Sequence, residues 1–292
     1  EDFFRSTLVQ TLFYGLFSAW VLWHEKQPDG GKFDLWRDTR RMNIPVISEL
    51  FNQFSDGTYL PLSVEQILEW TADALNRVDR ATFFATFNKG AAVQYFYEPF
   101  LEAFDPDLRR QLGVWYTPPE VVEYMVARVD AALKYDLGIA DGLADPNVYV
   151  LDPCCGTGAY LIAVLRHIYA ALQARDGDAL AAQAVQQAMR ERVFGFEILP
   201  APFVVAHLQI GILLNRLHAP LAAGQRAGVY LTNALTGWEP PREPKTMLLF
   251  PELQKERDAA DAVKRGRPIL VILGNPPYSG FAGVAIEEER TL

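Results

Sequence analysis

The spacing of apolar residues divides this chain into two parts with different rhythms. Up to about residue 110, apolar residues recur every three or four positions, which is typical of helices. The clearest of these helical patterns cover residues 6–23, 64–78 and 91–104. From about residue 113, short β-rich runs alternate with helical ones. The β-rich runs are 148–152, 192–198, 229–233 and 268–275.

This alternation of strands and helices predicts the fold class. Strand–helix alternation is typical of a parallel, doubly wound sheet, and strands that are apolar on both faces suit burial between two helical layers. We therefore expect an α/β, Rossmann-like, mostly parallel sheet preceded by an α-helical N-terminal domain. The boundaries that we predict are 1–110 for the helical domain and 111–292 for the α/β domain, with the sheet incomplete at its C-terminal end.

Residues 6–23 carry no charge and have to be considered as a membrane span. They include polar residues, and Leu8, Leu12, Leu16 and Trp20 recur at four-residue spacing. This pattern favours a buried amphipathic helix over a span, so we expect no membrane association. The N-terminus begins with Glu-Asp and has no basic region of the kind that opens a signal peptide.

Charge and cysteine usage narrow the function classes. The net charge of −9 and the pI near 5.0 argue against a surface that wraps a polyanion. A compact basic run at 264–267 could still contact nucleic acid, although such runs are more often solvated loops. The only cysteines, Cys154 and Cys155, are adjacent, which indicates a reducing, cytoplasmic setting. No Cys/His cluster has zinc spacing, and we expect no metal.

A glycine-containing turn follows the first β-rich run in "VLDPCCGTGAYL". Asp152 ends the strand, and Gly156 and Gly158 allow the backbone to approach a ligand closely before a helix begins near Ala159. Ligands of Rossmann-like folds bind at this junction, beyond the carboxyl ends of the strands. A carboxylate here would repel a pyrophosphate, so it suits a ligand with a cationic amino-acid portion.

An acidic residue also ends the second strand. Glu197 stands where a carboxylate can accept hydrogen bonds from both ribose hydroxyls of a nucleoside. It follows Asp152 by more than the usual spacing of about 20 residues. An additional helix at 178–191 accounts for the difference.

The motif "NPPY" at 275–278 follows the last β-rich run. Together with "DPCCGTG" and with "GVWYTPPEVVEYMV" at 113–126, it resembles the S-adenosylmethionine-dependent DNA adenine-N6 methyltransferases. The motif order is similar to the class whose recognition domain lies C-terminal to the catalytic one. The combination of an α-helical N-terminal domain (1–110) with these motifs is most similar to type ISP restriction–modification enzymes and related phage-defence methyltransferases.

The resemblance implies a role for each matching residue. Tyr116, Thr117 and Pro118 would border the methionine end of S-adenosylmethionine, Glu197 would bind its ribose and Ile198 would pack on its adenine. Asn233 replaces the acidic residue that the family commonly uses to contact the cofactor base. The residues implied to line the methionine and sugar portion are Asp152, Cys154, Gly156, Thr157 and Gly158.

The same resemblance implies the chemistry of the NPPY tetrad, residues 275–278. The side-chain oxygen of Asn275 and the carbonyl of Pro276 would accept the two N6 hydrogens of an adenine. Pro276 and Pro277 stiffen the corner, and Tyr278 offers a face for a base flipped out of double-stranded DNA.

Two other function classes stay open. The tetrad also resembles that of protein glutamine-N5 and ribosomal-RNA guanine-N2 methyltransferases, although "DPCCGTG" and "WYTPPE" suit the DNA group better. A catalytically inactive, methyltransferase-like scaffold or specificity module is the other class. About 14 residues follow the tetrad, so we expect further target-recognition domains or subunits in a longer protein.

Overall fold

The computed structural model divides the chain into two compact units, Glu1–Gln111 and Leu112–Leu292. This division lies one residue from the predicted boundary. The structure describes residues 2–27, 30–42, 44, 47–48, 50–52, 62–87, 117–222, 224–239 and 251–276. The predicted helix over 91–104 lies outside these residues.

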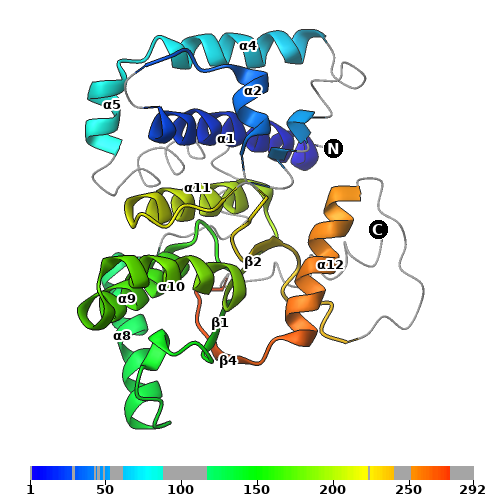
Figure 1. Cartoon of the computed structure of the whole chain (residues 1–292). Helices are drawn as coiled ribbons and strands as arrows, with labels where there is room; N and C mark the ends of the chain where they lie inside the picture. The colour runs from blue at the N-terminus through cyan, green and yellow to red at the C-terminus, as the bar shows by residue number, and fades with distance from the viewer. Residues whose placement is uncertain are drawn as a thin grey trace. The chain divides into compact units, whose positions relative to one another are not determined.

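The first unit is helical in its described residues (Figure 1). Its helices are α1 (Asp2–Lys26), α2 (Leu35–Arg40), α4 (Leu62–Asn76) and α5 (Arg80–Phe87). Two of them, α1 and α4, contain the helices predicted over 6–23 and most of 64–78. The short helices α2 and α5 were not predicted, because each offers too few turns for a periodic pattern.

Helix α1 differs from the prediction in one respect. It is not amphipathic, because its residues from Gln10 to Val21 are all buried except the half-buried Phe13. Aromatic side chains of α5 pack on it, with the ring of Phe84 4.9 Å from that of Trp20 and 3.7 Å from that of His24. Among the helices that the structure describes, none is both long enough and apolar enough to span a membrane.

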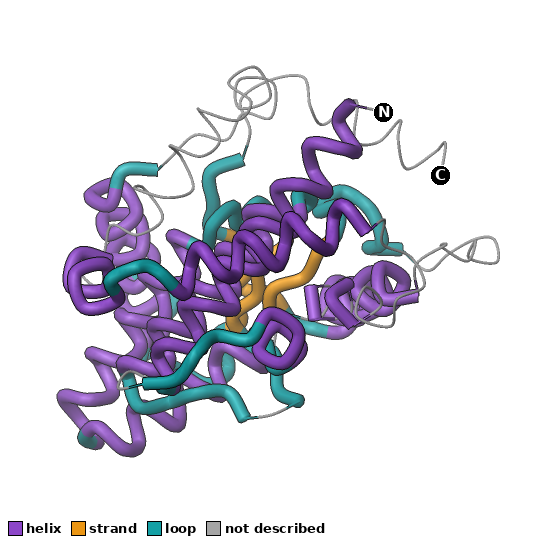
Figure 2. Tube along the Cα trace, turned by 90° about the horizontal axis from the view of Figure 1, so that it is seen from above, coloured by secondary structure: helices purple, strands orange, loops and turns teal. Residues whose placement is uncertain are grey.

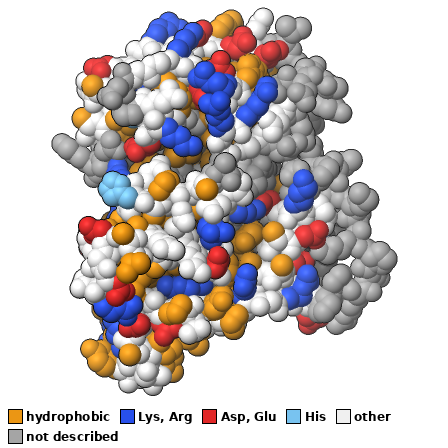
Figure 3. Space-filling model, viewed as in Figure 1, with side chains coloured by type: hydrophobic (Ala, Val, Ile, Leu, Met, Phe, Trp, Pro, Cys, Tyr) orange, Lys and Arg blue, Asp and Glu red, His pale blue; other side chains and the backbone are white. Residues whose placement is uncertain are grey.

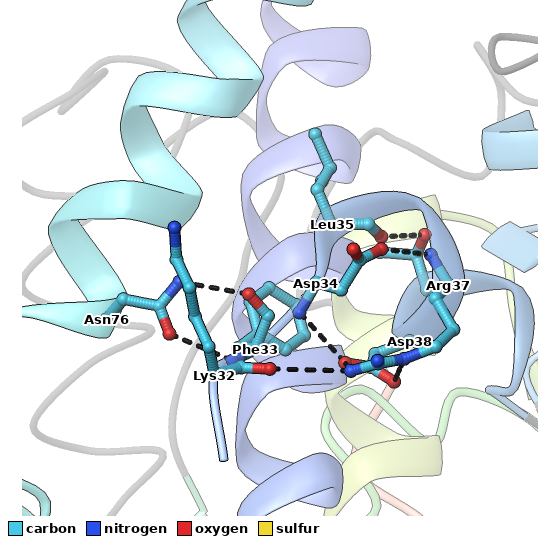
Figure 4. A network of polar contacts seen from close by, with 8 residues as sticks. Lys32, Phe33, Asp34, Leu35, Arg37, Asp38 and Asn76 are labelled. Atoms are coloured by element: carbon cyan, nitrogen blue, oxygen red, sulfur yellow. Dashed lines mark hydrogen bonds and ion pairs between the residues drawn. The ribbon is translucent and has the colours of Figure 1, made fainter.

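A network of polar contacts holds the segment before α2 against α4 (Figure 4). The side chain of Asn76 bonds both backbone groups of Phe33, each at 2.9 Å. Asp34 caps α2 by accepting from the N–H of Arg37 at 2.7 Å, and its own N–H donates to Asp38 at 2.9 Å. The Asp34 cap satisfies one of the free N–H groups at the start of this short helix.

The second unit contains a four-stranded parallel sheet in the order β3-β2-β1-β4. The strands, orange in Figure 2, are β1 (Tyr149–Asp152), β2 (Val193–Glu197), β3 (Val229–Leu231) and β4 (Ile269–Ile272). Each lies within a predicted β-rich run, so the predicted α/β fold with a parallel sheet is confirmed. Along the chain the strands are added on one side of β1 as far as β3, and β4 is then added on the other side of β1.

Helices cover both faces of this sheet (Figure 1). They are α8 (Pro119–Tyr135), the short 3₁₀ turn η1 (Gly142–Ala144), α9 (Ala159–Asp176), α10 (Asp178–Glu191), α11 (Pro200–Arg216) and α12 (Pro251–Gly266). Successive residues of a strand face opposite sides. On β2, Gly195 faces α9, because a Cβ there would lie 2.7 Å from Leu161. Its neighbours Phe194 and Phe196 share a buried cluster with Ala260 and Val263 of α12.

Helix α12 was not predicted from the sequence. Two buried charged side chains anchor it to the end of β3. Glu256 pairs with Arg226 and accepts from the N–H of Leu231 at 3.2 Å. Lys264 donates to the hydroxyl of Thr232 at 3.0 Å and to the carbonyl of Asn233 at 2.8 Å. The loop that follows β3 is therefore held from the α12 side of the sheet.

Candidate functional site

The carboxyl ends of the four parallel strands meet at one edge of the sheet. Backbone hydrogen bonds continue past the strand ends and tie the loops together there. The N–H of Cys155 donates to Phe196, that of Thr232 to Glu197 and that of Leu273 to Leu151, at 2.8–3.0 Å. The predicted site residues of all four strands, from Asp152 to Asn275, therefore lie along a single edge.

The turn after β1 has the conformation that its glycines allow. Gly156 and Gly158 have φ angles of +53° and +91°, a region that other residues rarely adopt. A Cβ on Gly158 would touch Ala206 of α11 at 3.4 Å, so this glycine serves close packing of helix on turn. A Cβ on Gly156 would meet nothing within 4 Å. The space into which a side chain of residue 156 would project is therefore open to a ligand.

Glu197 is buried and supports this turn. One of its carboxylate oxygens accepts from the N–H of Gly156 at 2.9 Å. The other accepts from the N–H groups of Ile198 and Leu199, both at 2.8 Å. A carboxylate offers about four acceptor positions, so these three bonds leave about one for a ribose hydroxyl. Burial raises the pKa of Glu197, although the three N–H groups act in the opposite direction.

Asp152 is buried, and among the residues that the structure describes one of its two carboxyl oxygens has no partner. Oδ1 accepts from the N–H of Cys154 at 3.1 Å, whereas Oδ2 is buried without a hydrogen bond. Burial, with a smaller contribution from the charge of Glu197, raises the pKa of Asp152 to about 8. An unpaired buried acceptor is costly, and an ammonium group would satisfy it. This carboxyl therefore fits the amino-acid end of S-adenosylmethionine.

Within the described part of the chain, Asn233 also has a buried polar atom without a partner. Its Oδ1 accepts from the N–H of Leu235 at 2.9 Å, which fixes the orientation of the amide, and its Nδ2 is buried and unpaired. The predicted contact used the amide oxygen toward an exocyclic amine. The atom that lacks a partner is instead the donor, which suits a ring nitrogen of a base.

Three large apolar side chains are exposed at the same edge. Ile198 follows β2, and Leu235 and Trp238 follow β3. The indole of Trp238 is oriented by a hydrogen bond to the carbonyl of Ala234 at 2.8 Å. They give an apolar surface for a planar base. Only Ile198 was predicted, since the residues after Asn233 match no motif.

The residues that precede α8 meet the residue that follows β4. The side-chain Nδ2 of Asn275 donates to the hydroxyl of Thr117 at 3.1 Å, across 158 positions of sequence. Gly274 lies directly against Asp152, because a Cβ there would fall 2.5 Å from Oδ1. Pro118 and Pro276 are also described, whereas the predicted site residues Tyr116, Pro277 and Tyr278 lie outside the described residues.

Neither the two cysteines nor the first residue of the basic run 264–267 is placed to act on a substrate or on DNA. Burial raises the pKa of Cys154 to about 11 and holds that of Cys155 well above its ordinary value, so neither thiol ionises near neutrality. Lys264, the first residue of the basic run, is buried in α12 against β3. Residues 265–267 of the run are exposed, as expected for a solvated segment, although α12 extends to Gly266; Lys264 is buried and is not available to nucleic acid. Side chains of both charge signs are interspersed on the face shown in Figure 3.

Comparison with known proteins adds to this geometry. The family model described as N-6 DNA methylase matches residues 90–222. This match covers less than half of the chain and agrees with the predicted resemblance over those residues. The N-6 DNA methylase match includes Thr117, the turn after β1 and Glu197, and it ends before Asn233 and Asn275. No curated protein matches the chain at a significant level.

Solved structures similar to this chain are restriction–modification enzymes or DNA complexes. A DrdV–DNA complex is 22% identical with a TM-score of 0.62 and is matched over 94% of this chain. A nuclease-deletion mutant of the type ISP restriction–modification enzyme LlaGI, in complex with a DNA substrate mimic, is 18% identical with a TM-score of 0.60, over 94%. The ATP-dependent type ISP enzyme LlaBIII bound to DNA is 19% identical with a TM-score of 0.59, over 92%.

At these identities the likenesses show a shared fold with the three solved structures. The chain spans 24%, 20% and 17% of the lengths of those proteins, respectively.

Proposed function

We propose that this chain is the methyl-transfer part of a longer DNA methyltransferase that modifies the N6 amino group of adenine, with S-adenosylmethionine as donor. The observation that carries the proposal is the position of Asn275. Gly274 lies against Asp152, and Asn275 bonds Thr117, so the tetrad begins beside the strand that leads into the glycine turn.

In this proposal the strand-end residues hold the cofactor. The unpaired Oδ2 of Asp152 accepts from the ammonium of the methionine portion. Glu197 uses its remaining acceptor position for a ribose hydroxyl, and the open space before Gly156 admits the sugar. The base lies against Ile198, and Nδ2 of Asn233 donates to it. When bound, S-adenosylmethionine would supply a methyl group carried on a positively charged sulfur. After transfer of the methyl group, that sulfur would be left as a neutral thioether.

Asn275 and Pro276 act on the substrate amine. The lone pair of adenine N6 is delocalised into the ring, which makes the nitrogen a poor nucleophile. Two acceptors, Oδ1 of Asn275 and the carbonyl of Pro276, hold the two N6 hydrogens and favour the positive charge that develops as nitrogen attacks the methyl carbon. Tyr278 stacks on the flipped base and returns part of the unstacking free energy of a few kcal/mol.

Other parts of the longer protein supply target recognition. The similar solved structures are DNA complexes of much longer chains. This chain has a net charge of −9, so we expect most of the phosphate contacts that give affinity to come from other domains or subunits. We further propose a restriction–modification or phage-defence role and a cytoplasmic location.

A methyl-transfer assay tests this function. Full-length protein is incubated with unmethylated plasmid DNA and tritiated S-adenosylmethionine, and the DNA is digested to identify the labelled base. We expect label in N6-methyladenine, and a loss of about 100-fold or more for Asn275→Ala, because an acceptor for the developing charge is removed. Asn147→Ala, which changes an exposed residue before β1, is the matched control and keeps wild-type activity.

Each outcome of this assay discriminates between function classes. Parallel reactions offer cellular protein or ribosomal RNA in place of the plasmid: label in protein would favour glutamine methylation, and label in ribosomal RNA would favour guanine methylation. An absence of transfer to any of these acceptors by the full-length wild type would favour an inactive scaffold and overturn the proposal.

A further inference from the structure

We infer that Thr117 is a positioning residue that holds the amide of Asn275 in the orientation needed for methyl transfer. This inference rests on the proposed function. The family resemblance assigns Thr117 to the cofactor, whereas the structure places its hydroxyl 3.1 Å from the side-chain nitrogen of Asn275. Thr117 would therefore contact both the cofactor and the residue that acts on the substrate amine.

An asparagine amide needs an outside partner to be fixed in place. Its terminal torsion joins an sp³ carbon to an sp² carbon, and such torsions have broad preferences with the two faces nearly equivalent. The proposed reaction requires Oδ1 of Asn275 to face the substrate amine. Among the residues that the structure describes, Asn275 makes one side-chain hydrogen bond, from Nδ2 to Thr117, and Oδ1 stays free to accept.

Thr117 is a rigid anchor for this bond. A β-branched side chain has restricted rotamers, and a residue that precedes proline has a restricted backbone. Pro118 has φ −53° and ψ 137°, and Pro119 opens α8. The carbonyl of Pro118 accepts from the N–H groups of Val121 and Val122 at 3.0 and 3.2 Å.

Helix α8 is itself fixed to the rest of the second unit. Its buried Asp130 accepts from the N–H of Leu143 in η1 at 2.9 Å and pairs with His167 of α9 at 3.1 Å. The hydroxyl of Tyr160 on α9 lies 3.0 Å from the sulfur of Met125. The position of Thr117 therefore follows that of α9, the helix that starts at the glycine turn.

The asparagine end is held in a similar way. Asn275 also precedes a proline, Pro276, so its backbone is restricted too. Gly274 lies against Asp152, and the N–H of Leu273 donates to Leu151 at 3.0 Å. Both ends of the hydrogen bond are thus fixed before a substrate arrives, and preorganisation of this kind lowers the barrier of the reaction.

A double-mutant cycle in the full-length protein tests the inference. Thr117→Val removes the acceptor at nearly constant volume, and Thr117→Ser keeps it. Methyl transfer is measured in single turnover at saturating DNA and cofactor, while calorimetry gives the Kd for S-adenosylmethionine separately. Thr71→Val, which changes a threonine of α4, is the matched control.

We expect Thr117→Val to lower the transfer rate about tenfold at saturating cofactor, and Thr117→Ser to stay within about twofold of wild type. In an Asn275→Ala background, Thr117→Val should change the rate by less than about twofold, because its effect acts through the asparagine. The same non-additivity should appear in thermal unfolding, with a Tm loss of ~2 °C for Thr117→Val that is absent in that background.

Additive effects of Thr117→Val and Asn275→Ala on transfer by an active wild type would overturn the inference and leave the proposed function intact. A loss confined to the Kd and KM for the cofactor would do the same, because Thr117 would then act on the cofactor alone. An absence of transfer by the wild type would overturn both.

Discussion

The carboxylate of Glu197 accepts the N–H of Gly156 at 2.9 Å, joining the end of β2 to the turn that follows β1. The turn thus depends on a residue 41 positions later in the chain. We expect Glu197→Gln to destabilise the second unit by about 1–3 kcal/mol, because the amide nitrogen of Gln donates and leaves at least one N–H unpaired. Thermal unfolding measures this loss. Glu123→Gln on the exposed face of α8 is the control, and an equal effect of both changes would contradict the interpretation.

Asp152 should make folding stability depend on pH. Burial raises the pKa of its carboxyl from the ordinary value of 3.8 to about 8, so the folded protein holds this proton more tightly than the unfolded chain does. The carboxyl therefore costs no folding free energy below pH 3.8, a growing amount as the pH rises toward 8, and a constant amount above 8.

Asp152→Asn removes this titration, so we expect the variant to gain stability over wild type as the pH rises from about 4 to 8. The comparison is a series of Tm values without ligand, with a gain of ~5 °C or more at pH 8. A difference that stays constant over this pH range would show that Asp152 keeps its ordinary pKa. The variant should also bind S-adenosylmethionine more weakly, since it offers no charge to the ammonium.

Gly274 and Gly266 form a matched pair for testing the packing at the site. A Cβ at Gly274 would lie 2.5 Å from Oδ1 of Asp152, whereas a Cβ at Gly266 would meet nothing within 4 Å. We expect Gly274→Ala to displace the tetrad and lower methyl transfer about tenfold or more. Gly266→Ala should keep wild-type activity and stability. Equal activity of the two variants would mean that the tetrad does not need its present position.

Lys264 should be a stability residue and not a DNA contact. Lys264→Met removes a buried donor to Thr232 and Asn233, so we expect a loss of about 2–4 kcal/mol in unfolding free energy. The exposed Arg265→Met should cost less than about 1 kcal/mol. A stable Lys264→Met variant with weaker, less salt-dependent DNA binding would instead assign the lysine to phosphate contacts.

The strands were predictable from sequence because each is a short, mostly apolar run; β1 to β3 are largely buried as expected, whereas Leu270 and Ile272 of β4 are exposed. Helix α12 was missed because only a narrow stripe, including Ala260 and Val263, is apolar. Its other buried residues include Glu256, which pairs with Arg226, and Lys264, which donates to Thr232 and Asn233. A hydrophobic pattern cannot reveal a helix that is anchored by buried charges.

The site residues that belong to recognisable sequence motifs were predictable. Asp152, Glu197 and Asn275 were identified from their places after strands, and parallel topology brings them to one edge. The roles of Gly274 and of the Thr117 hydroxyl depend on contacts between distant segments, which spacing along the chain does not encode. The unpaired amide nitrogen of Asn233 likewise follows from a local turn to Leu235 that only the structure reveals.

The place of β4 beside β1 has a consequence for how the protein is made. The first strand of the sheet leaves the ribosome more than a hundred residues before the neighbour that completes its pairing. During that interval this edge of β1 has no β4 to pair with, and Gly274 is not yet in place against the carboxyl of Asp152. The segment that covers this edge also carries Asn275, so in a nascent chain the pairing of β4 with β1 and the arrival of this acceptor at the site belong to one late event.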